Sequence, residues 1–152
     1  MPTIKEGDWL SIPLPEGGYA LGLAARASRS YPYLFAYFFG PRRMEPPTLE
    51  DAARLRPADS LFQAIASLAL NFTTIGAHPN YSRADWPMPK FVMRDNGNLF
   101  LVTRDENDPG TIISKEPAQE ADVVGLPKHL LLEDKTLPLR IELHLVQQRQ
   151  GF

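Results

Sequence analysis

The sequence predicts a β-rich α+β domain: an antiparallel, twisted sheet or a partly open barrel of about six to eight strands, with one or two short helices. Two turn signals and one aromatic segment carry this prediction. Gly17-Gly18 and Asn96-Gly97 each separate two stretches of alternating apolar residues, as in a β-hairpin. The segment Tyr33–Phe39 is apolar throughout, which indicates a central strand covered on both faces. A length of 152 residues suits one domain, residues 1–152.

The first hairpin surrounds Gly17-Gly18. One face of its two strands is apolar, through Leu10, Ile12 and Leu14 and then Tyr19, Leu21 and Leu23. Pro13 and Pro15 lack the N–H group that pairing with a neighbouring strand requires. We therefore expect the first strand to lie at an edge of the sheet or to leave it early.

A short helix and an ambiguous segment follow the aromatic strand. Thr48 and Asp51 fit a capping box, which predicts a helix over Leu49–Leu55 that ends before Pro57. Residues 58–70 fit both a helical stripe and one face of a strand. Their alanines favour a helix while their length allows either, so both structures stay open.

The C-terminal part of the chain is predicted to add strands. A second hairpin turns at Asn96-Gly97, and Thr111–Lys115 is a further short strand. Residues 125–128 indicate a turn that opens one helical turn at 129–131. The last predicted strand has an apolar face of Leu137, Leu139, Ile141, Leu143 and Leu145 and a polar face with Arg140, Glu142 and His144. That strand could be an exposed edge.

Composition excludes several classes of protein. A net charge of −2 gives no basic field to attract nucleic acid or an anionic membrane. The absence of cysteine excludes disulfides, thiol catalysis and cysteine metal sites. The N-terminus shows no apolar signal segment, and the longest apolar stretches are too short to span a bilayer. We expect a soluble, cytoplasmic protein.

Motifs of catalysis and metal binding are incomplete. Residues 105–116 resemble a calcium loop in part, but Pro109 and Ile113 stand where oxygen ligands are needed, and the flanks predict strands. An acidic turn between strands explains this segment better. No metal-ligand spacing joins the histidines, which are His78, His129 and His144. We predict no catalytic residue, no metal site and no cofactor.

Two features are typical of a protein-binding surface. The loop before the second hairpin carries Tyr81 and Trp86, which could anchor a partner or pack the loop onto the core. Acidic residues could oppose a basic partner or simply be solvated: Asp105, Glu106, Asp108, Glu116, Glu120 and Asp122.

The opening motif also resembles a known family. Gly-Asp-x-x-x-Ile-Pro-Leu-Pro-x-Gly-Gly-Tyr-x-x-Gly, over Gly7–Gly22, is similar to the start of the immunity protein 26 family. Shorter motifs resemble the middle of that family: Ile75-Gly76, Trp86-Pro87, Pro89-x-Phe91 and Asn96-Gly97-Asn98. The similarity extends to about Leu145 and favours a strand for residues 58–70.

The resemblance implies a function. Members are cytoplasmic bacterial proteins encoded beside a polymorphic or contact-dependent toxin, often a nuclease, which they bind and neutralise. The resemblance therefore implies that this chain is a β-rich, non-enzymatic inhibitor. Its partner would be the cognate toxin, and it would not contact nucleic acid or a membrane directly.

Two alternatives stay open. A small-ligand or glycan-binding β-barrel would line a cavity with the aromatic strand Tyr33–Phe39. A hydrolase would bring together at least two polar residues from the set His78, His129, His144, Asp85 and Asp105.

Overall fold

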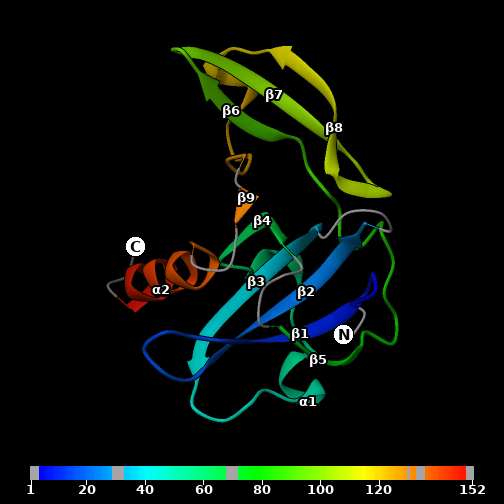
Figure 1. The fold of residues 1–152 in the computed structure, drawn as a ribbon, viewed down its shortest axis with the longest axis vertical. Coiled ribbons are helices and arrows are strands. Elements are labelled where there is room, and N and C mark those ends of the chain that lie inside the picture. The colour runs from blue at the N-terminus through cyan, green and yellow to red at the C-terminus, as the bar shows by residue number, and fades with distance from the viewer. Residues whose placement is uncertain (1–3, 29–32, 68–71, 130, 133–135, 150–152) are drawn as a thin grey trace.

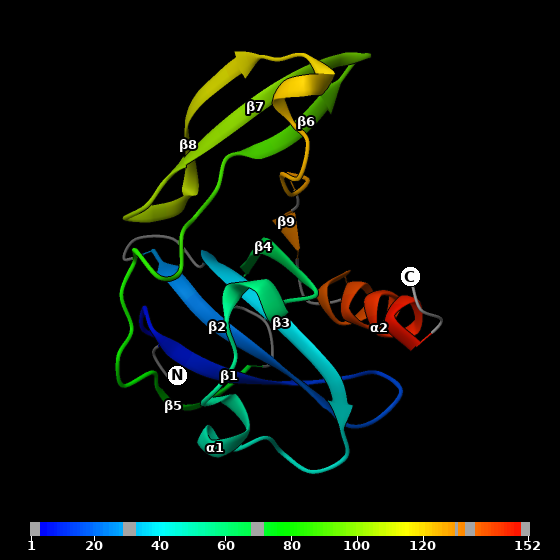
Figure 2. The same cartoon turned by 180° about the vertical axis from the view of Figure 1, so that it is seen from behind.

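The computed structural model describes residues 4–28, 33–67, 72–129, 131–132 and 136–149. They form two antiparallel sheets with one long helix (Figures 1 and 2). The larger sheet has the strand order β5-β1-β2-β3-β4-β9, with only the short β9 parallel to its neighbour. Its strands are β1 (Asp8–Pro13), β2 (Tyr19–Ala27), β3 (Tyr33–Arg43), β4 (Phe62–Ser67), β5 (Thr73–Ala77) and β9 (Leu131–Leu132).

The smaller sheet has the order β6-β7-β8 and lies over one end of the larger one (Figure 1). Its strands are β6 (Phe91–Asp95), β7 (Asn98–Asp105) and β8 (Asp108–Pro117). The helices are α1 (Leu49–Ala52) and α2 (Thr136–Arg149), with 3₁₀ turns at Pro57–Asp59 and Glu120–Asp122. Neither sheet closes on itself, so the β-rich α+β class is confirmed in its open-sheet form.

The N-terminal hairpin forms as predicted. Gly17 and Gly18 have φ angles of 97° and 78°. A Cβ at Gly18 would lie 2.6 Å from the carbonyl oxygen of Arg43, so only glycine fits there. The predicted edge position is wrong, because β1 lies between β5 and β2. The strand also stays in the sheet up to Pro13, which pairs with Tyr19 of β2, while its pairing with β5 ends at Ser11, before Pro13 could be needed as a donor.

Strand β3 is the central strand that the aromatic segment predicts. Phe35 and Phe39 face one core cluster, while Leu34 and Phe38 face the other, and all four are fully buried. Helix α2 covers the Phe38 side. The loop before β6, together with β6 and β7, covers the other side. This double burial of Leu34, Phe35, Phe38 and Phe39 in packed side chains counts against the β-barrel alternative.

Other local predictions hold. Thr48 and Asp51 form the capping box, and the helix they begin ends at Ala52, three residues earlier than predicted. Within 58–70, residues 62–67 form a strand, while residues 68–70 lie outside the described residues. Asn96 and Gly97 adopt positive φ angles of 50° and 81°, as a tight hairpin turn requires.

The predicted last strand is wrong, because these residues form α2. Its five apolar residues divide between two sides, with Leu137, Ile141 and Leu145 buried and Leu139 and Leu143 exposed. A spacing of four residues is common to alternate positions of a strand face and to one face of a helix, so Leu137, Ile141 and Leu145 fit either structure. Pro138 lies in the first turn, where an N–H has no helical partner to lose.

Two smaller predictions also need correction. The chain between β7 and β8 turns at Glu106-Asn107, and Pro109-Gly110 already belong to β8. The helical turn predicted at 129–131 is wrong, because Lys128 bridges to Val92 and Leu131 begins β9. Lys128 therefore pairs with β6, and Leu131 and Leu132 pair with β4. No helix of the described residues is long and apolar enough to cross a membrane.

Candidate functional site

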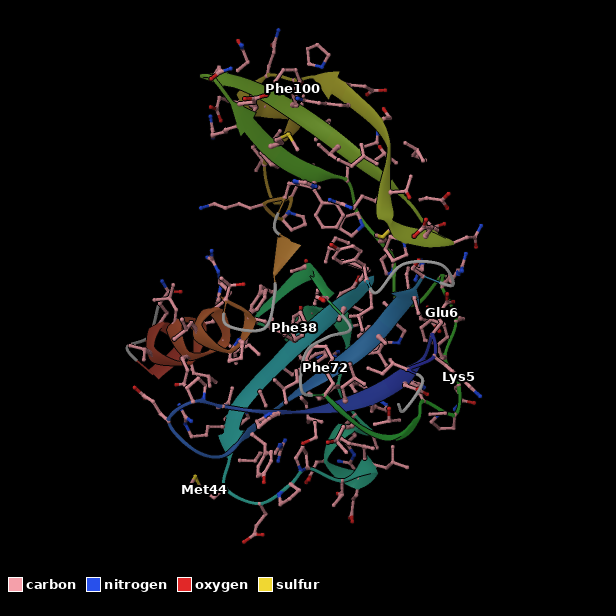
Figure 3. The ribbon with its side chains drawn as sticks, viewed as in Figure 1. Lys5, Glu6, Phe38, Met44, Phe72 and Phe100 are labelled. Atoms are coloured by element: carbon pink, nitrogen blue, oxygen red, sulfur yellow. The ribbon has the colours of Figure 1, made fainter. Side chains whose placement is uncertain are left out.

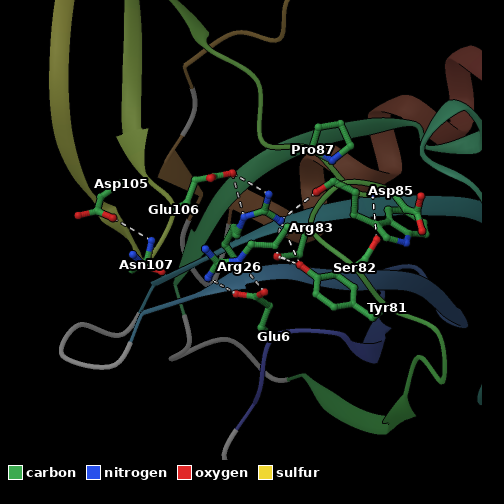
Figure 4. Close-up of polar contacts among 12 residues, drawn as sticks. Glu6, Arg26, Tyr81, Ser82, Arg83, Asp85, Pro87, Asp105, Glu106 and Asn107 are labelled. Carbon is green, nitrogen blue, oxygen red and sulfur yellow. Dashed lines mark hydrogen bonds and ion pairs between the residues drawn. The ribbon is translucent and has the colours of Figure 1, made fainter.

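Arg26 is the centre of a polar junction between β2, the loop before β6 and the β7–β8 turn (Figure 4). Its side chain is only 1% exposed. Nη1 donates hydrogen bonds to the backbone oxygens of Ala25 (2.7 Å) and Trp86 (2.9 Å) and lies 3.0 Å from the Tyr81 hydroxyl. Nη2 and Nε donate to Glu106 Oε1 at 2.7 and 3.2 Å. These acceptors compensate the burial of the positive charge.

Tyr81 and Arg83 connect this junction to the N-terminal segment. Arg83 donates two hydrogen bonds of 2.8 Å to the carboxylate of Glu6. Burial raises the pKa of Glu6, but hydrogen bonds and charge from Arg83 outweigh it and hold that pKa below its ordinary value. Burial also raises the pKa of Tyr81 to about 12, so its hydroxyl stays protonated and donates to the carbonyl oxygen of Ala25.

An open cavity of about 840 Å³ lies beside the junction. Its polar walls include Lys5, Glu6, Ser28, Arg83 and Asn107. Among the lining residues, the side chains of Arg83 and Glu6 are 40% and 25% exposed. The cavity is large enough for a small ligand or for a few side chains of a partner protein.

The structure gathers three of the predicted acidic residues at this end of the smaller sheet. Asp105 and Glu106 lie at the β7–β8 turn, and Asp108 accepts hydrogen bonds from Ser28 (2.6 Å) and Thr111 (2.8 Å). Those hydroxyl groups hold the pKa of Asp108 below its ordinary value. Asp108 is therefore ionised at neutral pH, and its bond to Ser28 and the bond of Glu106 to Arg26 attach the β7–β8 end of the smaller sheet to the end of β2.

The other three predicted acidic residues lie further along the smaller sheet. Glu116 lies near the end of β8, and Glu120 and Asp122 follow it. Asp108 pairs with Asp105 and Glu116 pairs with Leu101, four residues earlier in β7, so about 13 Å of strand separates the two groups at 3.3 Å per residue. Figure 3 shows this separation, with Glu6 near the junction and Phe100, which pairs with Pro117, at the far end. The six residues form two groups and not one patch.

Trp86 is 3% exposed and packs its ring edge against Trp9, 5.8 Å between ring centroids. Tyr37 donates a hydrogen bond to the carbonyl oxygen of Pro87 beside it. Tyr81 is half-buried against Gly7. The loop is therefore packed onto the core, and the Trp86 ring is not available on the surface.

The three histidines occupy three separate environments. His78 stacks on Trp9 at 5.7 Å, and His144 stacks on Phe62 at 4.6 Å. His129 accepts a hydrogen bond from Arg104 Nε at 3.2 Å. Within the described ranges, no group of three or more His, Asp or Glu side chains is arranged to hold a metal ion. The convergence of histidines that the hydrolase alternative expects is not present here.

Sequence reasoning missed Arg26, Glu6 and Arg83. Arg26 stands alone in an apolar strand, and its acceptors lie 55, 60 and 80 residues away in the chain. The one available signal was the position itself, because an arginine flanked by alanines in a buried strand needs partners.

The Immunity protein 26 family matches residues 5–99 of the chain. This match is shorter than the span to about Leu145 that the motifs led us to expect, and it ends inside β7. It includes Arg26, Tyr81 and the whole N-terminal hairpin. No curated protein and no solved structure gives a significant match. Because the matched segment covers well over half of the chain, the protein belongs to the Immunity protein 26 family.

Proposed function

We propose that this protein binds a cognate bacterial toxin in the cytoplasm and neutralises it. The family match over residues 5–99 carries this proposal, because an immunity protein acts through a toxin partner. The toxin would belong to a polymorphic or contact-dependent system, with a nuclease as the first activity to test.

The geometry is better suited to binding than to catalysis. The charged side chains at the junction are held in pairs, Arg26 with Glu106 and Arg83 with Glu6. A framework of paired charges presents a fixed surface, which lowers the entropy lost on binding.

The exposed acidic residues stay predicted toxin contacts. The side chains of Glu106, Glu116 and Glu120 are 51%, 60% and 74% exposed. Each already lies near a cation of the same chain: Arg26, Lys90 and Arg94 respectively. A basic toxin would have to compete with those cations, so we expect these carboxylates to guide the encounter more than to hold the complex.

Co-expression tests the proposed function. The toxin domain encoded beside this gene is expressed from an inducible promoter, alone and together with the chain. We expect growth arrest with the toxin alone, full growth with both, and a stoichiometric complex on size exclusion. An unrelated toxin serves as the control. Arrest that persists although the chain is folded and soluble would contradict the proposal, as would a neighbouring gene product that is not toxic.

A further inference from the structure

Helix α2 has a second apolar face that nothing in the described chain covers. Its first face, with Leu137, Ile141 and Leu145, packs into the core. Its second face presents Leu139, Leu143 and Val146, which are 60%, 48% and 39% exposed. Spacings of four and three residues place these three side chains in one stripe along the helix. Such a stripe is typical of a surface that binds another protein.

A groove of about 430 Å³ runs beside this stripe. Leu143 belongs to both the stripe and the groove, and Leu126 and Pro127 line the opposite wall. The Phe62 and His144 rings, stacked at 4.6 Å, also line it. Burial, and then the charge of Arg140, lower the pKa of His144 below its ordinary value of 6.5, so this ring is uncharged at neutral pH.

The described lining of the groove carries positive charge. Its lining includes Lys128 and Arg140 and no carboxylate. Elsewhere, eight lysine or arginine side chains form ion pairs with carboxylates. In the part of the chain that the structure describes, Lys128 and Arg140 form none. Two free cations at an apolar groove favour a ligand that supplies both carboxylates and apolar side chains.

We propose that the toxin docks on the α2 groove through an acidic, amphipathic segment. Apolar side chains of this segment cover Leu139 and Leu143, and its Asp or Glu side chains pair with Lys128 and Arg140. This inference rests on the proposed function and adds the contact surface and its chemistry. A nucleic acid suits the site less well, because two cations attract phosphates weakly and bases do not need a leucine stripe.

A second copy of this chain also suits the site less well. In a two-fold symmetric dimer the same surface meets itself, so one interface would contain both copies of Lys128 and of Arg140. Like charges at an interface oppose association. The same two cations attract the carboxylates of an acidic partner and so favour its binding.

Binding variants test the groove with the toxin that co-expression identifies as neutralised. Lys128→Glu combined with Arg140→Glu reverses the charge, and Leu143→Gln removes an apolar contact at an exposed helical position. We expect each to weaken toxin binding about tenfold or more in calorimetry, and to restore toxin sensitivity in cells. Raising NaCl from about 50 to about 300 mM should weaken binding of the natural chain more than of the charge-reversed chain.

Matched controls lie on other parts of the molecule. Arg54 is an exposed arginine after α1 that also forms no ion pair with a described residue, and Ile113 is 61% exposed on β8. Arg54→Glu and Ile113→Gln should leave the dissociation constant within about twofold. Circular dichroism melting verifies that every variant is folded.

The outcomes separate this inference from the proposed function. If the toxin is neutralised but the groove variants bind it as tightly as the natural chain, the inference is wrong and the immunity function stands. The same conclusion follows if the Arg54 and Ile113 controls weaken binding equally. A concentration-dependent dimer that Leu143→Gln dissociates would assign the groove to a second copy and overturn the inference.

Discussion

Arg26 is a buried charge that needs hydrogen-bond acceptors from several parts of the chain. Its guanidinium is 1% exposed and takes acceptors from the loop before β6 and from the β7–β8 turn. Arg83 makes two hydrogen bonds to Glu6 with similar geometry, but its side chain is 40% exposed. Water can replace the partner of Arg83 but cannot reach the guanidinium of Arg26, so the two residues differ in their contribution to stability.

We predict that Arg26→Met lowers the free energy of unfolding by about 3 kcal/mol, because buried acceptors lose their donors. Arg83→Met is the matched control and should lower it by about 1 kcal/mol or less. Urea unfolding followed by circular dichroism measures both values. If the two variants lose the same free energy of unfolding, the Arg26 junction contributes no more to stability than an exposed ion pair does.

His129 gives the stability of the protein a pH dependence. Burial, and then the charge of Arg104, lower the pKa of His129 in the folded chain from 6.5 to about 4. Between these two values the unfolded chain binds more protons at this histidine than the folded chain. The free energy of unfolding therefore falls as the pH drops from about 6.5 to about 4.

His129→Gln removes this titration while keeping an acceptor oxygen for Arg104. We predict that the free energy of unfolding of this variant depends less steeply on pH across that window than that of the natural chain. Urea titrations at about pH 7.5, 6 and 5 provide the comparison. Parallel pH profiles for the two chains would show that His129 is protonated alike in both states.

Among the elements, those with local signals were predictable. The two hairpins depend on glycines and an asparagine at the turn itself, and the capping box depends on two residues three positions apart. Strand β3 was recognisable because burial on both faces leaves no charged residue in its buried part, residues 34–39. Helix α2 was not, because its spacing fits two structures and the sheet decides between them by binding one of its faces. The Arg26 junction was not predictable either, because its partners meet only in the folded chain.

Two substitutions test directly whether the residues of α2 form a helix. In the helix, Ile141 is fully buried and Leu139 is 60% exposed, whereas a strand would place both on the same face. We predict that Ile141→Ala lowers the free energy of unfolding by about 2–4 kcal/mol and that Leu139→Ala changes it by less than about 0.5 kcal/mol. Chemical denaturation measures both. Similar losses would contradict the helix.

For the whole molecule, the contact between the two sheets decides how it unfolds. Phe91 of the smaller sheet is fully buried and meets Phe35 of the larger sheet at 5.7 Å. The pairs Arg26–Glu106 and Ser28–Asp108 join the same sheets at their edges. These contacts lead us to expect one cooperative unit, in line with the predicted single domain.

We predict that Phe91→Ala lowers the free energy of unfolding by about 3–4 kcal/mol while keeping a single transition. The control is Phe100, which is half-buried at the far end of the smaller sheet beneath Lys115. Phe100→Ala should lower the free energy of unfolding by about 1 kcal/mol. Far- and near-ultraviolet dichroism should give coincident curves. Two separate transitions would show that the smaller sheet folds independently.

The edge contact between Trp9 and Trp86 has a practical consequence for spectroscopy. These are the two tryptophans of the chain, and both are buried on the side of β3 opposite α2. Their emission should be that of a shielded indole pair and should shift to the red when the loop before β6 separates from the sheet. The α2 groove contains no tryptophan. A toxin bound there should therefore leave this emission unchanged, which makes the pair an intrinsic optical reference for loop integrity during titrations.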